Sequence, residues 1–395
     1  MKAYKLRLYP NKENLEKLEL SLEVCRQTYN NLLSELNQGY TKNEIQNWLL
    51  DLKVVYPEMK NIHSKVLQME NQKLFSNLSA LYNLKKNGKK VGKLRYRGKG
   101  WFKTFTYNQS GFKIIKTNKR LDLLRLSKIG GIPIRLHREI NGNIKQVVIK
   151  KSCDKWYATI ITDYKEERIC GDKELGIDLG INNYLVDSEE NYIEHPKFME
   201  ENKKLLRYAH KNLSRKKLRS KNRLKARKIL AKTYEKVANK RDDFLHKLSD
   251  SYIKKSRIIC IEDLNIKQMM ESFYNAKNMG DSSWGRFSQF LTYKAGNAGC
   301  KIVKIDPRNT TKKCSNCGNI QEMKLWNRTY KCENCDLEID RDYNSAINIY
   351  RLGISLCGDD VRPLGQLSEK QEAIISNIWV MGNSHNYWIK KYGLL

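Results

Sequence analysis

Four cysteines, arranged as two Cys-x-x-Cys pairs, constrain this chain more than any other feature. The pairs are Cys314 with Cys317 and Cys332 with Cys335, separated by 14 residues. This spacing predicts a site in which four thiolates bind one zinc ion, and it disfavours a redox pair or chance spacing. Four thiolates leave no position open for water, so such a site stabilises a fold without taking part in chemistry. We therefore expect a small structural zinc module within a larger protein.

The charge of the chain predicts a polyanionic partner. The sequence contains 75 Lys and Arg against 43 Asp and Glu, a formal net charge of +32. A protein this basic normally binds nucleic acid, although an anionic membrane surface is a rival partner. No run of about 18 apolar residues and no signal peptide at Met1 are visible, which favours a soluble intracellular protein. The six cysteines outside the paired motif are scattered singly, which fits a reducing compartment.

The first 170 residues combine a helical pattern with short strands. Lys2–Tyr9 alternates like a strand, and apolar residues then recur at helical spacing. Helices are expected near residues 15–36, 42–52 and 62–86. Strand-like runs at Lys145–Lys150 and Lys155–Thr162 suggest a small barrel, to which the first strand contributes. The helices would then form a bundle inserted into that barrel.

Two segments are strongly basic. Residues 85–128 contain 15 Lys and Arg and one acid, with aromatic residues interleaved. Residues 202–241 contain 17 Lys and Arg against the single acid Glu235, and Ser220–Asn222 could be the turn of a helical hairpin. A solvated helix face is the alternative interpretation of the second segment. So many cations would repel each other without a polyanion, which favours contact with nucleic-acid phosphates.

Three acids stand out by their position. Asp178 ends one apolar strand, Glu262 ends another, and Asp342 begins the helix after the zinc motif. Three clustered carboxylates would repel each other unless cations lay among them, and Mg²⁺ prefers such oxygen ligands. Two ions held there could support phosphodiester hydrolysis. Each acid could instead merely cap a strand or helix, and spacing alone leaves other acids open: Glu174, Asp187, Asp263, Asp306 and Asp340.

The order of several motifs resembles a known family. The segments that carry the resemblance are Tyr4–Asn11, Gly176–Ile181, Asp243–Ser249, Ile261–Leu264, the four cysteines and Asp340–Ile349. Together they are similar to TnpB, the transposon-encoded RNA-guided endonucleases related to type V CRISPR effectors. The resemblance covers nearly the whole chain, from residue 4 to about Ile349.

The resemblance implies an α/β multidomain fold. Its nuclease part would be a split RNase H-like (RuvC) domain with an inserted zinc ribbon, and a β-barrel wedge domain would carry an inserted helical recognition lobe. The expected boundaries are 1–10 and 93–170 for the oligonucleotide-binding-like wedge barrel, 11–92 for the recognition lobe, 171–312 and 338–356 for the RuvC domain including a basic helical hairpin at 202–250, 313–337 for the zinc ribbon, and 357–395 for a tail whose weak periodicity suggests disorder.

The resemblance also implies an activity. The family's catalytic acids match Asp178, Glu262 and Asp342, which would bind two Mg²⁺ ions and cut double-stranded DNA next to a short transposon-associated motif. The guide would be an RNA from the transposon end, bound by one protein monomer. The protein would act in a prokaryotic cytoplasm, where binding to DNA would place it at the nucleoid. A nuclease-inactive RNA-guided repressor is an alternative that the presence of all three acids disfavours. A DNA strand-transfer transposase is a second alternative.

Several residues are candidates for nucleic-acid contact. Gln68 matches a glutamine with which the family reads the adjacent motif, and a glutamine can bond adenine in the major groove. Thr106 matches another contact position, with Tyr107 and Asn108 as neighbours. Hairpin cations are candidates for phosphate contact: Lys211, Arg215, Lys216, Arg219, Arg223 and Arg227. Any of these residues could instead be an ordinary surface residue.

Overall fold

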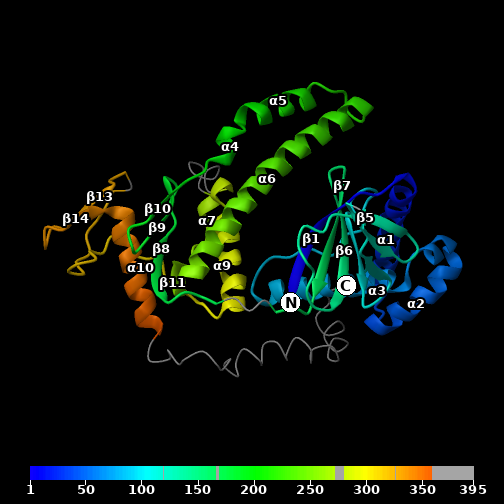
Figure 1. Cartoon of the computed structure of the whole chain (residues 1–395), viewed down its shortest axis with the longest axis horizontal. Helices are drawn as coiled ribbons and strands as arrows, with labels where there is room; N and C mark the ends of the chain where they lie inside the picture. The colour runs from blue at the N-terminus through cyan, green and yellow to red at the C-terminus, as the bar shows by residue number, and fades with distance from the viewer. Residues whose placement is uncertain (119, 166–168, 272–279, 325, 358–395) are drawn as a thin grey trace. The chain divides into compact units, whose positions relative to one another are not determined.

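The computed structural model describes residues 1–118, 120–165, 169–271, 280–324 and 326–357. These residues form two compact units, one within Met1–Lys165 and the other within Glu166–Gly365, and each is described by itself (Figure 1). The tail predicted from residue 357 onward lies outside the described residues, apart from Cys357 itself.

The first unit contains a seven-stranded antiparallel sheet. Its strand order is β2-β6-β7-β1-β5-β4-β3. The strands are β1 (Lys2–Leu8), β2 (Thr104–Asn108), β3 (Phe112–Ile115), β4 (Asp122–Leu126), β5 (Gly130–Ile134), β6 (Ile144–Ser152) and β7 (Lys155–Thr162). The predicted first strand is therefore an interior strand, paired along its whole length with β7. Strands β2 to β5 fall largely in the basic segment, where the sequence analysis predicted none.

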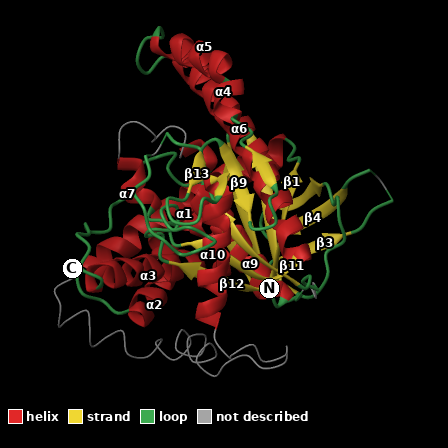
Figure 2. Ribbon diagram, turned by 90° about the vertical axis from the view of Figure 1, so that its left-hand side faces the viewer, coloured by secondary structure: helices red, strands yellow, loops and turns green. Residues whose placement is uncertain are grey.

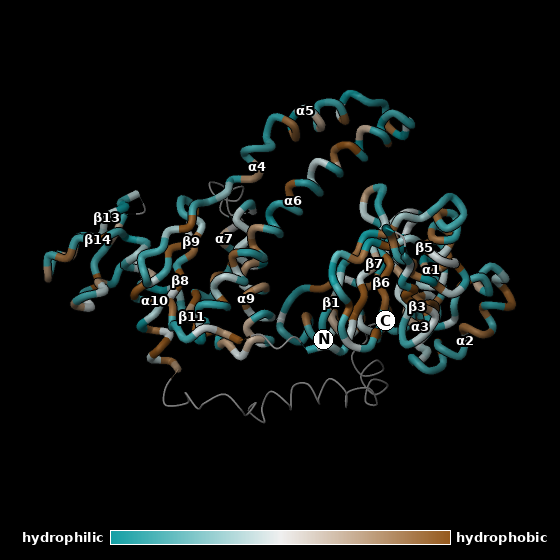
Figure 3. The backbone as a smooth tube through the Cα atoms, viewed as in Figure 1, coloured by the Kyte–Doolittle hydropathy of each residue, from teal (hydrophilic) through white to brown (hydrophobic). Residues whose placement is uncertain are grey.

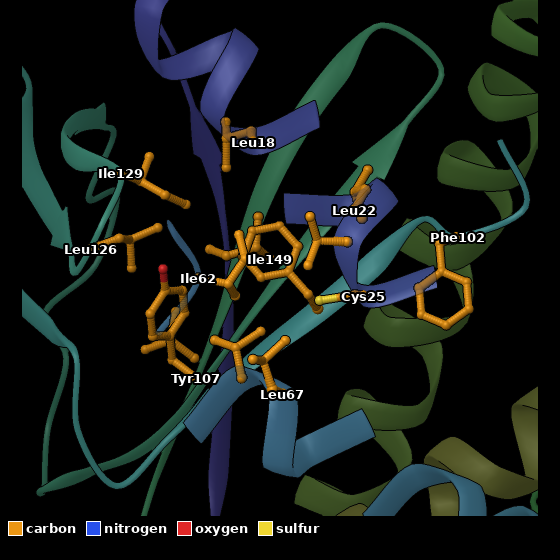
Figure 4. Close-up of a cluster of buried hydrophobic side chains, with 14 of the residues drawn as sticks. Leu18, Leu22, Cys25, Ile62, Leu67, Phe102, Tyr107, Leu126, Ile129 and Ile149 are labelled. Carbon is orange, nitrogen blue, oxygen red and sulfur yellow. The ribbon is translucent and has the colours of Figure 1, made fainter. Parts of the chain in front are cut away.

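Three helices separate β1 from β2 in the sequence, as predicted. They are α1 (Lys12–Asn37), α2 (Lys42–Val55) and α3 (Ser64–Lys86), with a 3₁₀ turn at Pro57–Asn61 between the last two. The side chain of Asn11 caps α1 by accepting a hydrogen bond from the Asn14 N–H (2.7 Å). Leu18, Leu22 and Cys25 of α1 share one buried cluster with Ile149 of β6, so helices and sheet have a common core (Figure 4).

The second unit contains a five-stranded mixed sheet of order β10-β9-β8-β11-β12. The strands are β8 (Lys173–Asp178), β9 (Asn183–Asp187), β10 (Tyr192–Glu194), β11 (Ser256–Glu262) and β12 (Lys301–Ile305). The sequence analysis predicted β8 and β11, as the apolar strands that end in Asp178 and Glu262. Strands β8, β11 and β12 are parallel, so their carboxyl ends meet at one edge of the sheet.

Helices cover both faces of this sheet. α10 (Arg341–Cys357) lies on one face, and α6 (Lys221–Lys255) and α9 (Trp284–Ala298) lie on the other (Figure 1). Alternate residues of β11 serve the two faces. Ile258 and Cys260 share a cluster with α10, whereas Ile259 and Ile261 share one with α6 and α9. The sequence analysis did not predict α9.

The predicted basic hairpin is formed by α5 (Lys203–Ser214) and the first part of α6, which extend beyond the sheet (Figure 2). Most of its residues are hydrophilic (Figure 3). Two short helices, α4 (Phe198–Glu201) and α7 (Ile266–Glu271), complete the described helices of this unit. Within the described part of the chain, no helix is both long and apolar enough to cross a membrane.

Candidate functional site

Strand alternation places two of the predicted acids on the same face of the second sheet. Asp178 is the last residue of β8 and Glu262 is the last residue of β11, and these strands are parallel neighbours with Ile177 opposite Ile261. Cys260 faces α10, so Glu262, two residues later, shares that face. Gly176 lies directly against α10, so Asp178 shares the face as well. The two carboxylates therefore lie side by side at the carboxyl edge of the sheet.

Two glycines bring the helix that carries the third acid onto this face. A Cβ atom on Gly176 of β8 would lie 2.3 Å from the Ala346 carbonyl oxygen and 2.4 Å from the Tyr350 nitrogen of α10. A Cβ atom on Gly353 of α10 would lie 2.1 Å from Cys260 Sγ. Only hydrogen atoms fit at these two positions. The helix therefore packs against the strands closely, with Asp342 in its first turn.

The other two acids act electrostatically on Asp178. Asp178 and Asp342 are 8% and 7% exposed. Burial raises the pKa of Asp178 well above its ordinary value, and the negative charges of Glu262 and Asp342 raise it further, while Arg341 opposes them. Burial also raises the pKa of Glu262. Asp178 and Asp342 are buried and Glu262 is partly exposed, and neighbouring carboxylates of this kind are a donor set that divalent cations such as Mg²⁺ can bind.

Three neighbours of the acids were missed by the sequence analysis. Thr310 is buried, and its hydroxyl donates to Glu262 Oε1 (2.6 Å). Arg328 Nη1 lies 3.6 Å from Asp342 Oδ2. The Arg328 guanidinium also donates hydrogen bonds to the side-chain oxygen of Asn182, in the orientation of the Asn182 amide that turns its oxygen toward Arg328. Their sequence contexts carry no signal, because a single Thr, Arg or Asn in a loop is common.

The alternative acids have other roles in the structure. The Asp340 carboxylate caps α10 by accepting from the Asp342 and Tyr343 N–H groups (2.9 and 3.0 Å). Asp187 accepts hydrogen bonds from Asn191 and from the Tyr252 hydroxyl. The other three have local partners, in that Glu174 pairs with Arg257, Asp263 pairs with Lys304, and Asp306 accepts from the Arg308 N–H.

The four cysteines come together as predicted. Their sulfur atoms all lie within 4.8 Å of one another, with 3.7 Å between Cys314 and Cys335 and 3.5 Å between Cys317 and Cys332. A tetrahedral zinc ion with ~2.3 Å bonds to sulfur needs sulfur atoms about 3.8 Å apart. The donors therefore fit one structural zinc ion.

Hydrogen bonds join this zinc module to the helix that carries Asp342. The Asn344 side chain accepts from the Ser315 N–H and donates to the Lys313 carbonyl (both 2.8 Å). The Asn348 amide donates to the same carbonyl (2.7 Å) and to the Thr310 carbonyl (3.0 Å). Both asparagines are buried, so the backbone on either side of Cys314 is fixed to α10.

One predicted nucleic-acid contact does not fit the structure. Tyr107 is 2% exposed and belongs to the core of the first unit (Figure 4). Its hydroxyl donates to the Ser127 carbonyl (2.8 Å), and burial raises its pKa. The alternation of β2 points Tyr107 inward, whereas its neighbours Thr106 and Asn108 are partly exposed. Gln68 on α3 is also partly exposed.

The hairpin cations lie around the turn between α5 and α6. Most of them are exposed, namely Lys211, Arg215, Arg219 and Arg227, whereas Lys216 is partly exposed. Arg223 has a structural role as well, since its guanidinium donates to the Leu213 carbonyl (3.0 Å) and to the Lys216 carbonyl (3.2 Å) at the end of α5. The turn of the hairpin lies slightly before the predicted residues Ser220–Asn222, because Ser220 caps α6, which begins at Lys221.

Three family models match parts of the chain. A model described as a probable transposase matches residues 160–272, a helix-turn-helix domain model matches residues 1–44, and a Cas12f1-like TNB domain model matches residues 284–349. The last of these contains the four cysteines and Asp342.

Individual relatives agree with these models. A putative RNA-guided DNA endonuclease of Streptomyces pristinaespiralis is 26% identical over 397 residues, covering 94% of this chain and 96% of the relative. A TnpB-like protein of Acanthamoeba polyphaga mimivirus is 33% identical over 143 residues, covering 35% of this chain and 27% of the relative. A cryo-EM structure of a Cas12f1–sgRNA–target DNA complex shares the fold, with a TM-score of 0.61 and 17% identity over 86% of this chain and 83% of that chain. Near full-length similarity to these relatives and the order of the matched domains support a relationship of this chain to the TnpB family.

Proposed function

We propose that this protein is a transposon-encoded, RNA-guided DNA endonuclease whose hydrolytic site consists of Asp178, Glu262 and Asp342. The observation that supports the site assignment is that Asp178 and Glu262 end neighbouring parallel strands, and that their carboxylate charges and the charge of Asp342, in the first turn of α10, act on one another at that sheet edge. Relatives that span almost the whole chain carry the same activity in their names. The alternative acids form caps, hydrogen bonds or local ion pairs elsewhere, which supports the choice of Asp178, Glu262 and Asp342.

Each residue would have a distinct task in hydrolysis. Two Mg²⁺ ions, when bound, would supply activation of a water molecule and stabilisation of the leaving oxygen. Asp178, Glu262 and Asp342 would hold these ions. The Thr310 hydroxyl fixes the rotamer of Glu262, and such supporting hydrogen bonds tune metal affinity. Arg328 adds positive charge next to Asp342, where a DNA phosphate would approach.

Guide RNA and target DNA would be held mainly through their phosphates. In RNA-guided nucleases base pairing supplies sequence discrimination, so the protein needs charge and shape more than base-reading side chains. We assign phosphate contact to the hairpin cations and reading of the adjacent motif to Gln68, Thr106 and Asn108, in the predicted wedge and recognition domains. Replacing Lys211, Arg215 and Arg227 by serine should lower the salt dependence of RNA binding by about 2 to 3 units of log–log slope. An unchanged slope would refute the hairpin assignment.

The test begins with the protein expressed together with its native locus. RNA that copurifies is sequenced, and DNA matching that RNA is offered with Mg²⁺. We expect guided cleavage by wild-type protein and none by Glu262→Gln. Asp263→Asn is the matched control, because this neighbouring acid is exposed and pairs with Lys304 (2.8 Å). Equal loss in both variants, or full activity in Glu262→Gln, would contradict the site assignment.

A further inference from the structure

A pocket lies next to the buried core of the first unit. Its volume is about 630 Å³, and it is lined by residues of β3, β4 and β6 and of the segment that joins β5 to β6. Four of the lining side chains are aliphatic, partly exposed and packed against the core: Ile114, Leu136, Ile140 and Ile144. Pockets that bind small ligands have volumes of roughly 300–1,000 Å³ and mainly apolar walls. The size of this pocket and its aliphatic floor therefore suit an organic ring.

Hydrogen bonds hold the segment between β5 and β6 in place. The Asn141 N–H donates to the Tyr4 hydroxyl (3.3 Å), and the Asn143 N–H donates to Asp163 Oδ1 (2.7 Å). Between these residues, Gly142 lines the pocket with a φ of +81°, and a Cβ atom there would lie 2.8 Å from Asp163 Oδ1. Glycine is therefore required at this position. This wall of the pocket is preformed by its contacts with β1 and with the residue that follows β7.

Charged side chains of both signs complete the lining. Lys116 and Arg138 are exposed cations, and Asp122 and Glu139 supply carboxylates. The Asp122 carboxylate is held in place, because its Oδ1 accepts from the Thr117 N–H (2.9 Å). A wholly apolar ligand would strip water from these charges without replacing it, which is unfavourable. The lining instead fits a molecule that combines a flat apolar ring, N–H donors and an anionic group.

We propose that this pocket binds one nucleotide, whose base lies against the aliphatic floor, whose N–H edge faces Asp122 and whose phosphate lies beside Lys116 and Arg138. Guanine is the favoured base, because its adjacent N1–H and N2–H groups can both donate to one carboxylate. Uracil presents a single N–H between two carbonyl oxygens, which a carboxylate repels. This binding needs no hydrolysis and goes beyond the function proposed above. Two sources offer the same chemistry, a free nucleotide and an unpaired nucleotide of a bound RNA.

The first experiment measures binding of free nucleotides to the full-length protein prepared without RNA. Fluorescently labelled GMP is followed by anisotropy, and unlabelled GMP should displace it at a concentration at least ~10-fold lower than UMP. The double variant Lys116→Ala/Arg138→Ala should bind GMP about 10- to 100-fold more weakly, the range expected when hydrogen bonds to charged groups are lost.

The matched control is Lys113→Ala/Arg135→Ala. It removes the same charge from the same two stretches of chain, at exposed residues that are not among those lining the pocket. This control should bind GMP as the wild-type protein does. Equal weakening in the two double variants would mean general attraction of an anion by a basic protein, and it would overturn the assignment of the pocket.

The second experiment identifies the source of the nucleotide. Complexes with RNA from the native locus are treated with kethoxal, which modifies N1 and N2 of unpaired guanine. If the RNA supplies the nucleotide, one unpaired guanine should be protected in wild-type protein and in the matched control, and reactive in Lys116→Ala/Arg138→Ala and in Asp122→Asn. GMP binding without such a guanine assigns the pocket to a free nucleotide.

The absence of both GMP binding and a protected guanine would overturn the proposal. Neither readout uses hydrolysis. A wild-type protein that cuts no guided DNA would therefore contradict the proposed nuclease function and leave nucleotide binding to be judged by these two measurements.

Discussion

Replacing Gly176 by alanine should inactivate the enzyme without removing any proposed catalytic atom. The new Cβ would lie 2.3 Å from the Ala346 carbonyl oxygen and 2.4 Å from the Tyr350 nitrogen, and both are backbone atoms of α10 that no rotamer change can move. Ordinary contact needs roughly 3.4 Å, so helix and strand must separate by about 1 Å. Overpacking of this kind costs about 1–3 kcal/mol of stability. A displacement of ~1 Å at a reacting centre can cost ~10²-fold in rate, so Asp342 should lose its alignment.

Guided DNA cleavage and chemical denaturation are measured on the same preparation of Gly176→Ala. We expect at least a ~10²-fold slower cut, while target binding persists, because base pairing supplies it. Gly296→Ala is the matched control, since nothing lies within 4 Å of a Cβ at this position of α9. It should retain full activity and gain up to ~1 kcal/mol of stability. Wild-type cleavage by Gly176→Ala would show that close packing of α10 does not position Asp342.

Three further perturbations test other parts of the structure. Burial raises the pKa of Glu70, which is 1% exposed, to about 7, so the folded state keeps a proton that the unfolded chain releases above pH 4.5. The free energy of unfolding of the wild-type protein should therefore fall by up to ~3 kcal/mol as pH rises from 4.5 past 7. Denaturation of Glu70→Gln at pH 5 and pH 8 should show that most of this pH dependence is lost. Cys314→Ser should release zinc, measured by elemental analysis, and slow cleavage more than RNA binding; equal losses would argue against a link through α10. Thr310→Val should raise the Mg²⁺ concentration for half-maximal cleavage about 10- to 100-fold, and an unchanged Mg²⁺ titration would show that Glu262 needs no such support.

In the second unit, the sequence predicted the strands that end at the acidic edge of the sheet better than it predicted the residues around that edge. Apolar runs that end in Asp178 and Glu262 are strands because both faces are covered, and such runs are visible without a structure. The pattern could not separate Asp342 from Asp340, because both begin the same helix. Only the hydrogen bonds show that the Asp340 carboxylate caps α10, which favours Asp342 as the member of the proposed site.

Other features of the fold and of the candidate site could not be predicted from the local sequence pattern. The helix α9 has its apolar residues diluted by polar ones, and the sequence analysis missed it. Tyr107 was predicted as a contact because its neighbours match one, yet the two-residue period of β2 turns it into the core. Thr310 and Arg328 are brought to the acids by long-range packing, for which the local sequence carries no signal.

The helix α6 has a mechanical consequence. It runs without interruption for 35 residues, about 52 Å, from the tip of the basic hairpin to Lys255, and β11 begins at the next residue and ends at Glu262. No loop lies between the hairpin and that carboxylate. The number of residues in α6 and β11 therefore fixes the distance between the tip of the hairpin and Glu262. Removing one residue from α6 would shorten it by ~1.5 Å and turn the hairpin by ~100° relative to the sheet.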